Sequence, residues 1–223
     1  MRKTAVSSSA DFTSVLESLY SAVLADVLDS LGYRHQALPA HIRPLTPTKK
    51  ICGRVFPAAA RATYKIPAKP YELEIAAVDA LARGDVLVVD AAEDQSCAFW
   101  GELLTTACLA KGARGVVMTA CTRDMWKIRD LNFPVYGIGW HPGDSKGRLD
   151  VITVGEPIII GGVRARRGDW LLGDEDGVVI IPQEVAAKAI RLAQEKVSGE
   201  NIVRDELARG MPVGVAFRKY GIL

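Results

Sequence analysis

The segment from Gly101 to Asp124 constrains the fold of this chain more than any other part of the sequence. After Gly101 the apolar residues recur at helical spacing up to Gly112, a residue that commonly ends helices. The residues expected to share one face of this helix are Leu103, Leu104, Ala107 and Cys108. Residues 115–120 then form a short apolar run, typical of a buried parallel strand. A helix followed at once by such a strand predicts an α/β fold.

Two charged residues, Arg123 and Asp124, stand just past the expected strand. In open α/β sheets ligands bind beyond the carboxyl ends of the strands, and helix N-termini offer free N–H groups to anions. The segment therefore predicts a ligand site between the helix start and this pair. A plainer interpretation is also open, in which Asp124 only caps a short helix over residues 125–131 and Arg123 is a solvated charge.

The rest of the chain is predicted to contain further helices and strands. Two helices are expected between Asp11 and Gly32, and a proline-marked loop over residues 35–47. Asp176-Gly177 predicts a hairpin turn between the last two strands. The other expected elements are strands over 51–56, 60–65, 86–90, 170–174 and 178–182, and a helix over 72–81.

The C-terminal part, residues 183–223, is expected to form a helical arm. An amphipathic helix follows Pro182, and Ser198-Gly199 is expected to interrupt it before a second, shorter helix over 200–210. Residues 1–10 are polar and rich in serine, so we expect them to be frayed. A length of 223 residues suits a single domain over 1–223.

Composition excludes several classes of function. The net charge of +2 and the lack of a basic stripe argue against nucleic-acid binding. No apolar run approaches the roughly 20 residues that a membrane-spanning helix needs. The four cysteines form no Cys-x-x-Cys pair and no signal peptide is evident, so a reduced, cytoplasmic protein is expected. The three histidines form no zinc motif, so any metal should have oxygen ligands.

The ordered motifs of the chain resemble those of the RraA-like family. They are Trp100-Gly101-Glu102-Leu103-Leu104, Lys111-Gly112-Ala113-Arg114-Gly115-Val116-Val117, Thr122-Arg123-Asp124 and Phe133-Pro134-Val135-Tyr136. The resemblance extends over nearly the whole chain from about Ser21. It departs at Thr119-Ala120, where relatives commonly carry Asp-Gly, and at Arg167-Gly168-Asp169, where they often carry Pro-Gly-Asp.

The resemblance implies an α/β fold of the swivelling β/β/α type, with a central mixed sheet, flanking N-terminal helices and assembly as a trimer or hexamer. It also implies a class II pyruvate aldolase that cleaves a 4-hydroxy-2-oxo acid such as 4-hydroxy-4-methyl-2-oxoglutarate, with side activity as an oxaloacetate decarboxylase. The alternative in the same family is a non-catalytic regulator that binds a ribonuclease or helicase partner.

The chemistry of that reaction fits the residues of the central segment. Cleavage beside a 2-oxo group leaves an enolate, which needs a fixed positive charge, usually a divalent metal. Asp124 suits Mg²⁺ or Mn²⁺ as a carboxylate ligand, and Arg123 is the expected catalytic and substrate-binding residue. The backbone around Gly101, Glu102, Leu103 and Leu104 is expected to bind the substrate carboxylate.

The resemblance implies one more acidic metal ligand, from the helical arm of a neighbouring subunit. Glu200 is the first candidate and Glu195 the second. A lysine Schiff base is the rival mechanism, but Lys111 and Lys127 stand at helical positions expected to face solvent.

Overall fold

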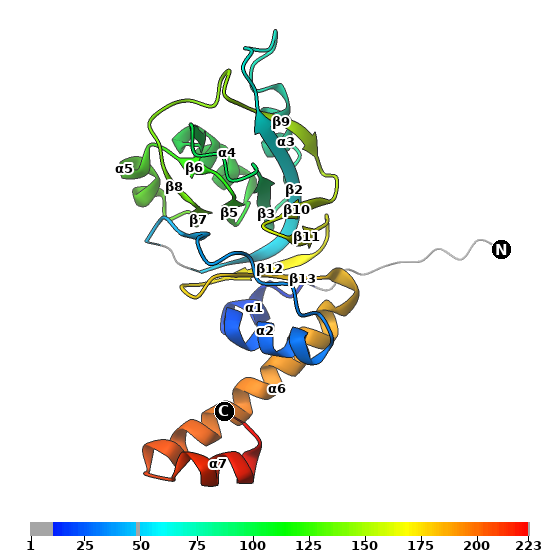
Figure 1. Cartoon of the computed structure of the whole chain (residues 1–223), viewed down its shortest axis with the longest axis vertical. Coiled ribbons are helices and arrows are strands. Elements are labelled where there is room, and N and C mark those ends of the chain that lie inside the picture. The colour runs from blue at the N-terminus through cyan, green and yellow to red at the C-terminus, as the bar shows by residue number, and fades with distance from the viewer. Residues whose placement is uncertain (1–10, 48–49, 223) are drawn as a thin grey trace, which may run out of the picture.

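A mixed central sheet forms the body of the computed structural model, which describes residues 11–47 and 50–222 (Figure 1). The expected frayed segment 1–10 lies outside the described residues. The strand order is β1-β7-β5-β3-β2-β12-β13, and β9 also pairs with β2. The strands are β1 (Arg43–Pro44), β2 (Ile51–Ala62), β3 (Asp85–Asp90), β5 (Gly115–Met118), β7 (Val135–Gly137), β9 (Leu149–Val154), β12 (Trp170–Gly173) and β13 (Val178–Ile181).

The pairing explains why the sheet is mixed. Three pairs of neighbouring strands are parallel: β2 with β3, β3 with β5, and β5 with β7. The other pairs in this sheet, which involve β1, β9, β12 and β13, are antiparallel. The hairpin expected at Asp176-Gly177 is present, with Trp170 opposite Ile181 and Gly173 opposite Val178. The expected α/β fold with a mixed central sheet is confirmed.

A second, smaller sheet carries the segment that the sequence singled out. It contains three short parallel strands, β4 (Ala98–Trp100), β6 (Cys121–Thr122) and β8 (Gly139–Trp140). A separate hairpin joins β10 (Ile158–Ile160) to β11 (Val163–Ala165).

The chain passes from the large sheet to the small one after β3, β5 and β7, and the last two passages lie at neighbouring points. Residues 115–120 were expected to form one strand, but β5 ends at Met118 and the chain bends through Thr119-Ala120 into β6. The last passage is at Ile138, between β7 and β8, and its N–H donates to the carbonyl of Ala120 at 3.1 Å. A Cβ on Gly137 would lie 2.8 Å from that carbonyl oxygen, so only glycine fits this crossing without a shift.

Helices cover the sheet in two groups. The α3 helix (Glu72–Asp79) and α4 helix (Glu102–Lys111) pack against one face of β2, β3 and β5, and α5 (Met125–Ile128) and a 3₁₀ turn (Arg129–Leu131) follow β6. The α1 helix (Thr13–Ser18), α2 (Ser21–Ser30) and the start of α6 (Gln183–Ala208) lie against β12 and β13 (Figure 1). Within residues 11–47 and 50–222, no helix is both long and apolar enough to cross a bilayer.

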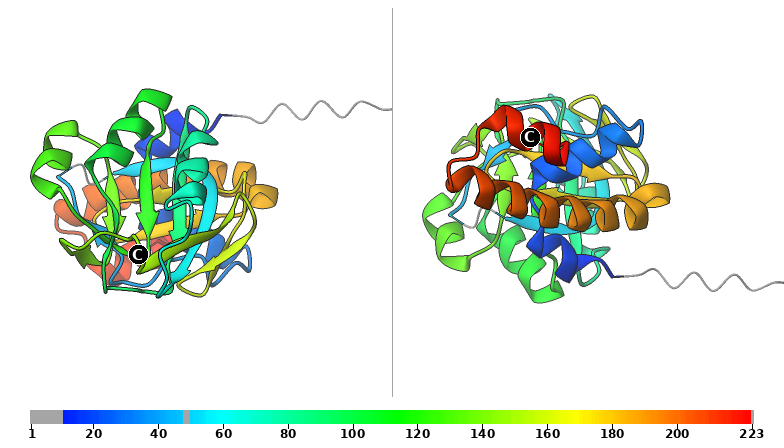
Figure 2. Two further views of the ribbon diagram at one scale, coloured as in Figure 1. Left: turned by 90° about the horizontal axis from the view of Figure 1, so that it is seen from above. Right: turned by 90° about the horizontal axis from the view of Figure 1, so that it is seen from below.

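Two further details of the expected elements were wrong. Residues 51–62 form one continuous strand, β2, rather than two. The α6 helix runs unbroken through Ser198-Gly199, and a further helix, α7 (Val213–Tyr220), follows it and lies alongside it (Figure 2). Leu103, expected on the same face of α4 as Cys108, is 78% exposed because this first turn faces a cavity rather than the core.

Candidate active site

The candidate site lies where the three strands of the small sheet end. Gly101 follows β4, Arg123 and Asp124 follow β6, and the loop after β8 leads to Asp144. The N–H of Arg123 donates to the carbonyl of Trp100 at 2.9 Å, so the first two strand ends are joined directly. Because parallel strands present their carboxyl ends at one edge, these polar side chains meet on one side of the molecule.

A buried hydrogen-bond relay fixes the start of α4. The indole Nε1 of Trp100 donates to Oγ1 of Thr105 at 2.9 Å, and that hydroxyl donates to the carbonyl of Gly101 at 3.0 Å. Both side chains are buried. The relay ties the end of β4 to the first turn of the helix, whose leading N–H groups have no acceptor within the helix.

Gly101 allows Asp124 to approach that first turn. A Cβ at Gly101 would lie 2.9 Å from Oδ2 of Asp124 and 3.6 Å from the side chain of Arg123. The same Oδ2 accepts the N–H of Glu102 at 3.3 Å. The carboxylate therefore lies at the positive, N-terminal end of the α4 dipole.

The interpretation of Asp124 as a side-chain cap of the following helix is wrong. Asp124 precedes α5, but its carboxylate makes no capping hydrogen bond there. Its backbone has a left-handed φ of 58°, an unusual conformation for a residue other than glycine. This turn directs the carboxylate back toward α4, so the local strain serves the geometry of the site.

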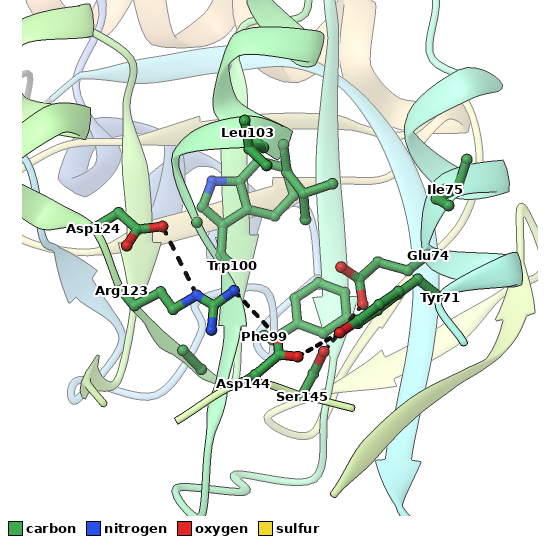
Figure 3. Close-up of a pocket in the computed structure, with 13 residues that line it drawn as sticks. Tyr71, Glu74, Ile75, Phe99, Trp100, Leu103, Arg123, Asp124, Asp144 and Ser145 are labelled. Carbon is green, nitrogen blue, oxygen red and sulfur yellow. Dashed lines mark hydrogen bonds and ion pairs between the residues drawn. The ribbon is translucent and has the colours of Figure 1, made fainter. Parts of the chain in front are cut away.

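Arg123 lies between two carboxylates (Figure 3). Its Nη2 is 3.2 Å from Oδ1 of Asp144, and its Nε is 3.8 Å from Oδ2 of Asp124. The phenol of Tyr71 donates to the other oxygen of Asp144. Tyr71 precedes α3 and, like Asp124, has a left-handed backbone, with φ 64°. Asp144 thus holds both the guanidinium and the phenol in place.

These groups line a cavity of about 290 Å³. Its walls are formed by Tyr71, Glu74, Ile75, Ala98, Phe99, Trp100, Gly101, Leu103, Leu104, Arg123, Asp124, Asp144 and Ser145. One wall is the start of α4 with Arg123 and Asp124, and the opposite wall carries Tyr71, Glu74 and Ser145 (Figure 3). The size suits a small organic acid.

Glu74 is the buried carboxyl group of the far wall. It is 8% exposed, and the hydroxyl of Ser145 lies 3.5 Å from its Oε2 as a donor. Burial raises the pKa of Glu74 to about 7, and the negative charge of Asp144 adds to the rise. Its protonation therefore changes near neutral pH.

A comparison with protein families shows to which family the chain belongs. The family model described as RraA-like, Aldolase/RraA, matches residues 21–180. The chain belongs to the RraA-like family. Its curated relatives include DlpA of Legionella pneumophila, 32% identical over 188 residues, which are 79% of this chain and 29% of DlpA. A protein of Halalkalibacterium halodurans named "Putative 4-hydroxy-4-methyl-2-oxoglutarate aldolase" is 28% identical over 186 residues, 83% of each chain.

Solved RraA-like structures share the fold. An uncharacterised protein from Pseudomonas syringae aligns with a TM-score of 0.80 at 28% identity, over 92% of this chain and 96% of that one. RraAS2 of Streptomyces coelicolor, described as an unusual member of the RNase ES inhibitor RraA family, aligns with a TM-score of 0.79 at 25% identity. That alignment covers 86% of this chain and 96% of RraAS2.

The fold brings most of the predicted site residues of this RraA-like chain together. Gly101, Leu103, Leu104, Arg123 and Asp124 all line the one cavity. Glu102 contributes its backbone N–H to Asp124, but its side chain turns away, toward Thr106 and Lys127.

Glu200 lies elsewhere in the protomer. It is on α6, where its carboxylate accepts the phenol of Tyr20 and lies 3.9 Å from Nζ of Lys196. Glu195 pairs with Arg191 on an exposed face of the same helix. Neither glutamate lines the cavity that contains Asp124. A shared metal site therefore needs an α6 helix from another subunit.

The donor set fits a hard divalent cation that keeps most of its water. In the described part of the chain, no three His, Cys, Asp or Glu side chains gather closely enough to enclose a metal. Asp124 still offers a carboxylate at the cavity wall, 42% exposed. Mg²⁺ and Mn²⁺ bind through one or two carboxylates plus water and substrate oxygens, which is the kind of site this wall can form.

Four polar residues of the RraA-like site were not predicted from the sequence: Tyr71, Glu74, Asp144 and Ser145. Asp144-Ser145 had a usable signal, because this polar pair follows a glycine-rich strand end. Tyr71 and Glu74 had none, since they reach the cavity through the packing of α3 beside β9.

The Thr119-Ala120 departure from the usual family motif lies beneath the site. The hydroxyl of Thr119 accepts the N–H of Ala91 at 2.8 Å and donates to the carboxylate of Asp90 at 3.2 Å. Both Thr119 and Ala120 are fully buried, and neither lines the cavity. The departure therefore lies in the support of the β6 segment, outside the lining of the cavity.

Proposed function

We propose that this RraA-like chain is a divalent-metal-dependent lyase that cleaves a 4-hydroxy-2-oxo acid to pyruvate and a second carbonyl compound. The substrate class is the one that includes 4-hydroxy-4-methyl-2-oxoglutarate. The observation that carries the proposal is the meeting of the α4 N-terminus, Arg123 and Asp124 in one cavity of about 290 Å³. The aldolase names of relatives such as the Halalkalibacterium protein support it.

The pyruvate half of the substrate fits the wall formed by α4. The amides of Leu103 and Leu104 belong to the first helical turn and can donate to the substrate carboxylate. Arg123 then lies beside the 2-oxo group, and its side chain is held from both sides by Asp124 and Asp144. A planar guanidinium fixed in this way is suited to stabilise the oxygen that gains charge.

The reaction breaks the bond between carbons 3 and 4. Its electron pair moves into the 2-oxo system, the hydroxyl at carbon 4 loses its proton to form a carbonyl, and carbon 3 later accepts a proton to give pyruvate. We propose that Arg123 also orients the water that accepts the hydroxyl proton. A bound Mg²⁺ or Mn²⁺ would supply Lewis-acid polarisation of the 2-oxo group, with Asp124 as a ligand.

Oxaloacetate decarboxylation is the side activity we propose. Loss of carbon dioxide from oxaloacetate also breaks the bond between carbons 3 and 4 and leaves the same electron pair in the 2-oxo system. The wall that stabilises one enolate therefore serves the other. We also propose a cytoplasmic location, because the four cysteines are buried and unbridged.

The assembly we propose is a trimer or hexamer in which Glu200 reaches the site of a neighbour. Apolar side chains on the arm support this, since Ile202, Val213 and Phe217 are half exposed or more. Exposed apolar surface of this kind needs a partner, and a neighbouring copy would place α6 beside a second cavity.

A pyruvate-release assay tests the proposal. Purified protein would be offered several 4-hydroxy-2-oxo acids with Mg²⁺, with Mn²⁺ and with chelator. Metal-dependent pyruvate release is expected, and Asp124→Asn and Arg123→Lys should each lose most of it. The matched controls are Asp130→Asn and Arg209→Lys, exposed positions outside the cavity, which should keep parental turnover. Full activity in Asp124→Asn at limiting metal would remove Asp124 from the site.

A second candidate function is regulation through a protein partner. The RraAS2 neighbour is described as belonging to a family of RNase ES inhibitors, and this chain exposes 71% of Trp126 and 59% of Trp140 near the site. Large exposed aromatic side chains often mark binding surfaces. Absence of pyruvate release, together with capture of a ribonuclease or helicase by the intact protein, would favour this function.

A further inference from the structure

The far wall of the cavity differs in charge from the wall that would bind pyruvate. Glu74 and Asp144 bring two carboxyl groups to it, and Tyr71 and Ser145 bring two hydroxyls. Arg123 is the one cationic side chain among the cavity-lining residues of the described chain, and it already faces Asp144 and Asp124. No lysine, arginine or histidine of the described chain therefore remains on this wall to receive a second substrate carboxylate.

The chemistry of this wall suits hydroxyl groups. Carboxylate oxygens accept hydrogen bonds from alcohols, and the Tyr71 and Ser145 oxygens can both donate and accept. The adjoining Phe99 and Ile75 offer apolar surface for the carbon-bound face of a short polyol. A carboxylate in the same place would face Asp144 and Glu74 in a partly desolvated cavity, where like charges repel strongly.

We propose that the substrate of this site is a 4-hydroxy-2-oxo acid whose distal end is neutral and hydroxylated, and that Glu74 and Asp144 bind those hydroxyls and exclude a distal carboxylate. This inference rests on the proposed aldolase function and narrows its substrate class, since 4-hydroxy-4-methyl-2-oxoglutarate carries a distal carboxylate and should be a poorer substrate than a neutral, hydroxylated analogue. Oxaloacetate is one carbon shorter than the five-carbon substrates, so we expect its second carboxylate to lie nearer Arg123 and short of Glu74.

The charge state of Glu74 supports the proposed exclusion of a distal carboxylate. The groups that face it are the carboxylates of Asp144 and Asp150, the guanidinium of Arg123 and the hydroxyl of Ser145. Burial raises the pKa of Glu74 to about 7. Below that pH the neutral acid can donate to a ligand, and above it the anion repels a carboxylate. Discrimination against a distal carboxylate should therefore increase between pH 6 and pH 8.

A matched pair of substrates tests the proposal. 4,5-Dihydroxy-2-oxopentanoate and 4-hydroxy-2-oxoglutarate have the same carbon chain and differ only in a terminal alcohol or carboxylate. The measurement is the ratio of their kcat/KM values for pyruvate release at pH 6 and pH 8. Because both substrates share the pyruvate half, effects of pH on the binding and reaction of that half cancel in this ratio.

The expected ratio favours the neutral substrate by about tenfold or more at pH 8 and by less at pH 6. In Glu74→Gln the ratio should no longer change with pH, whereas Glu72→Gln, an exposed position on the same helix, should behave as the parent. A preference for the glutarate would overturn this inference and leave the aldolase intact. Pyruvate release from neither substrate under any metal would overturn both.

Discussion

The guanidinium of Arg123 lies 3.2 Å from the carboxylate of Asp144, which also accepts the phenol of Tyr71. Arg123 comes from the end of β6, Asp144 from the loop after β8, and Tyr71 from the turn before α3. One carboxylate therefore connects three separate parts of the chain at the cavity. The position of the guanidinium depends on this contact as much as on its own backbone.

Asp144→Asn is expected to lower kcat/KM for pyruvate release by about ten- to a hundredfold, since a misplaced catalytic group is costly. The amide keeps the shape but loses the charge that orients Arg123. Melting temperature should change little, because the ion pair is partly exposed. Steady-state kinetics measures the effect, with Asp79→Asn as control for an exposed carboxylate that pairs with Lys111. Equal losses in both variants would contradict a positioning role for Asp144.

Gly101→Ala is expected to keep the fold and lose activity. The φ of Gly101 is −158°, which alanine also adopts, so the backbone is not strained. The new Cβ would lie 2.9 Å from Oδ2 of Asp124, and the carboxylate must move away from the α4 N-terminus. We expect about tenfold lower kcat/KM and weaker metal binding by calorimetry. Gly214→Ala is the control, because its Cβ would make only an ordinary contact with Arg218. Unchanged metal affinity in Gly101→Ala would argue against Asp124 as ligand.

Glu74→Gln should become more stable than the parent as pH rises. The folded-state pKa of about 7 lies above the ordinary value of 4.5, so between these values the folded protein holds a proton that the unfolded chain has released. The stability due to this proton is complete below pH 4.5 and is lost as pH rises through 7. Glutamine avoids the loss, which amounts to at most about 3 kcal/mol.

Denaturant unfolding of the parent and Glu74→Gln at pH 5 and pH 8 measures this difference. The gain from the substitution should be larger at pH 8. Glu72→Gln, an exposed substitution, should show no such trend. A gain that is the same at both pH values would mean that Glu74 titrates at its ordinary pKa.

Glu200→Gln should leave the oligomer intact and weaken metal binding, because Glu200 lies outside the cavity of its own protomer. Mixed with Asp124→Asn protein, it should regain part of the activity, since roughly a quarter of randomly formed interfaces carry both native carboxylates. Sedimentation confirms subunit exchange, and the pyruvate assay measures recovery. Glu195→Gln should show no metal defect, because Glu195 pairs with Arg191 on an exposed face. Confirmed exchange without recovery would exclude a shared site of this kind.

The sequence predicted the elements whose apolar pattern or turn residues are distinctive. The helix that starts after Gly101, the buried strand at Gly115 and the hairpin at Asp176-Gly177 are all present. The two- and three-residue strands of the small sheet were missed, since such lengths are too short to show a period. The bend at Thr119-Ala120 was missed for the same reason, because both residues continue an apolar run.

Tertiary packing determines the conformation of the C-terminal helical arm. Ser198-Gly199 is a reasonable helix interruption in sequence, yet α6 continues through it. A Cβ at Gly199 would lie 2.8 Å from Cδ1 of Ile222, so the glycine permits close packing of the chain end after α7. Propensity alone could not predict this, because the contact forms only when α7 folds back on α6.

The candidate site was predictable on one wall only. Gly101 starts a predicted helix, and Arg123 and Asp124 follow a predicted strand, so topology alone brings them near one another. The opposite wall depends on Tyr71 and Glu74, whose placement requires the left-handed turn before α3 and the packing of that helix. Such long-range relations leave no local pattern in the chain.

The continuous β2 strand contributes side chains to all three hydrophobic cores of the molecule. Its side chains contribute Phe56 and Ala58 to the core beneath α3 and α4, Cys52 to the core beneath α1 and α2, and Val55 to the core beside β10 and β11. Loss of this one strand would open all three cores together. We therefore expect the three cores to unfold cooperatively, because β2 is part of each of them. A circular permutant with new termini within β2 should fold poorly. A permutant with new termini in the Asp176-Gly177 turn should fold.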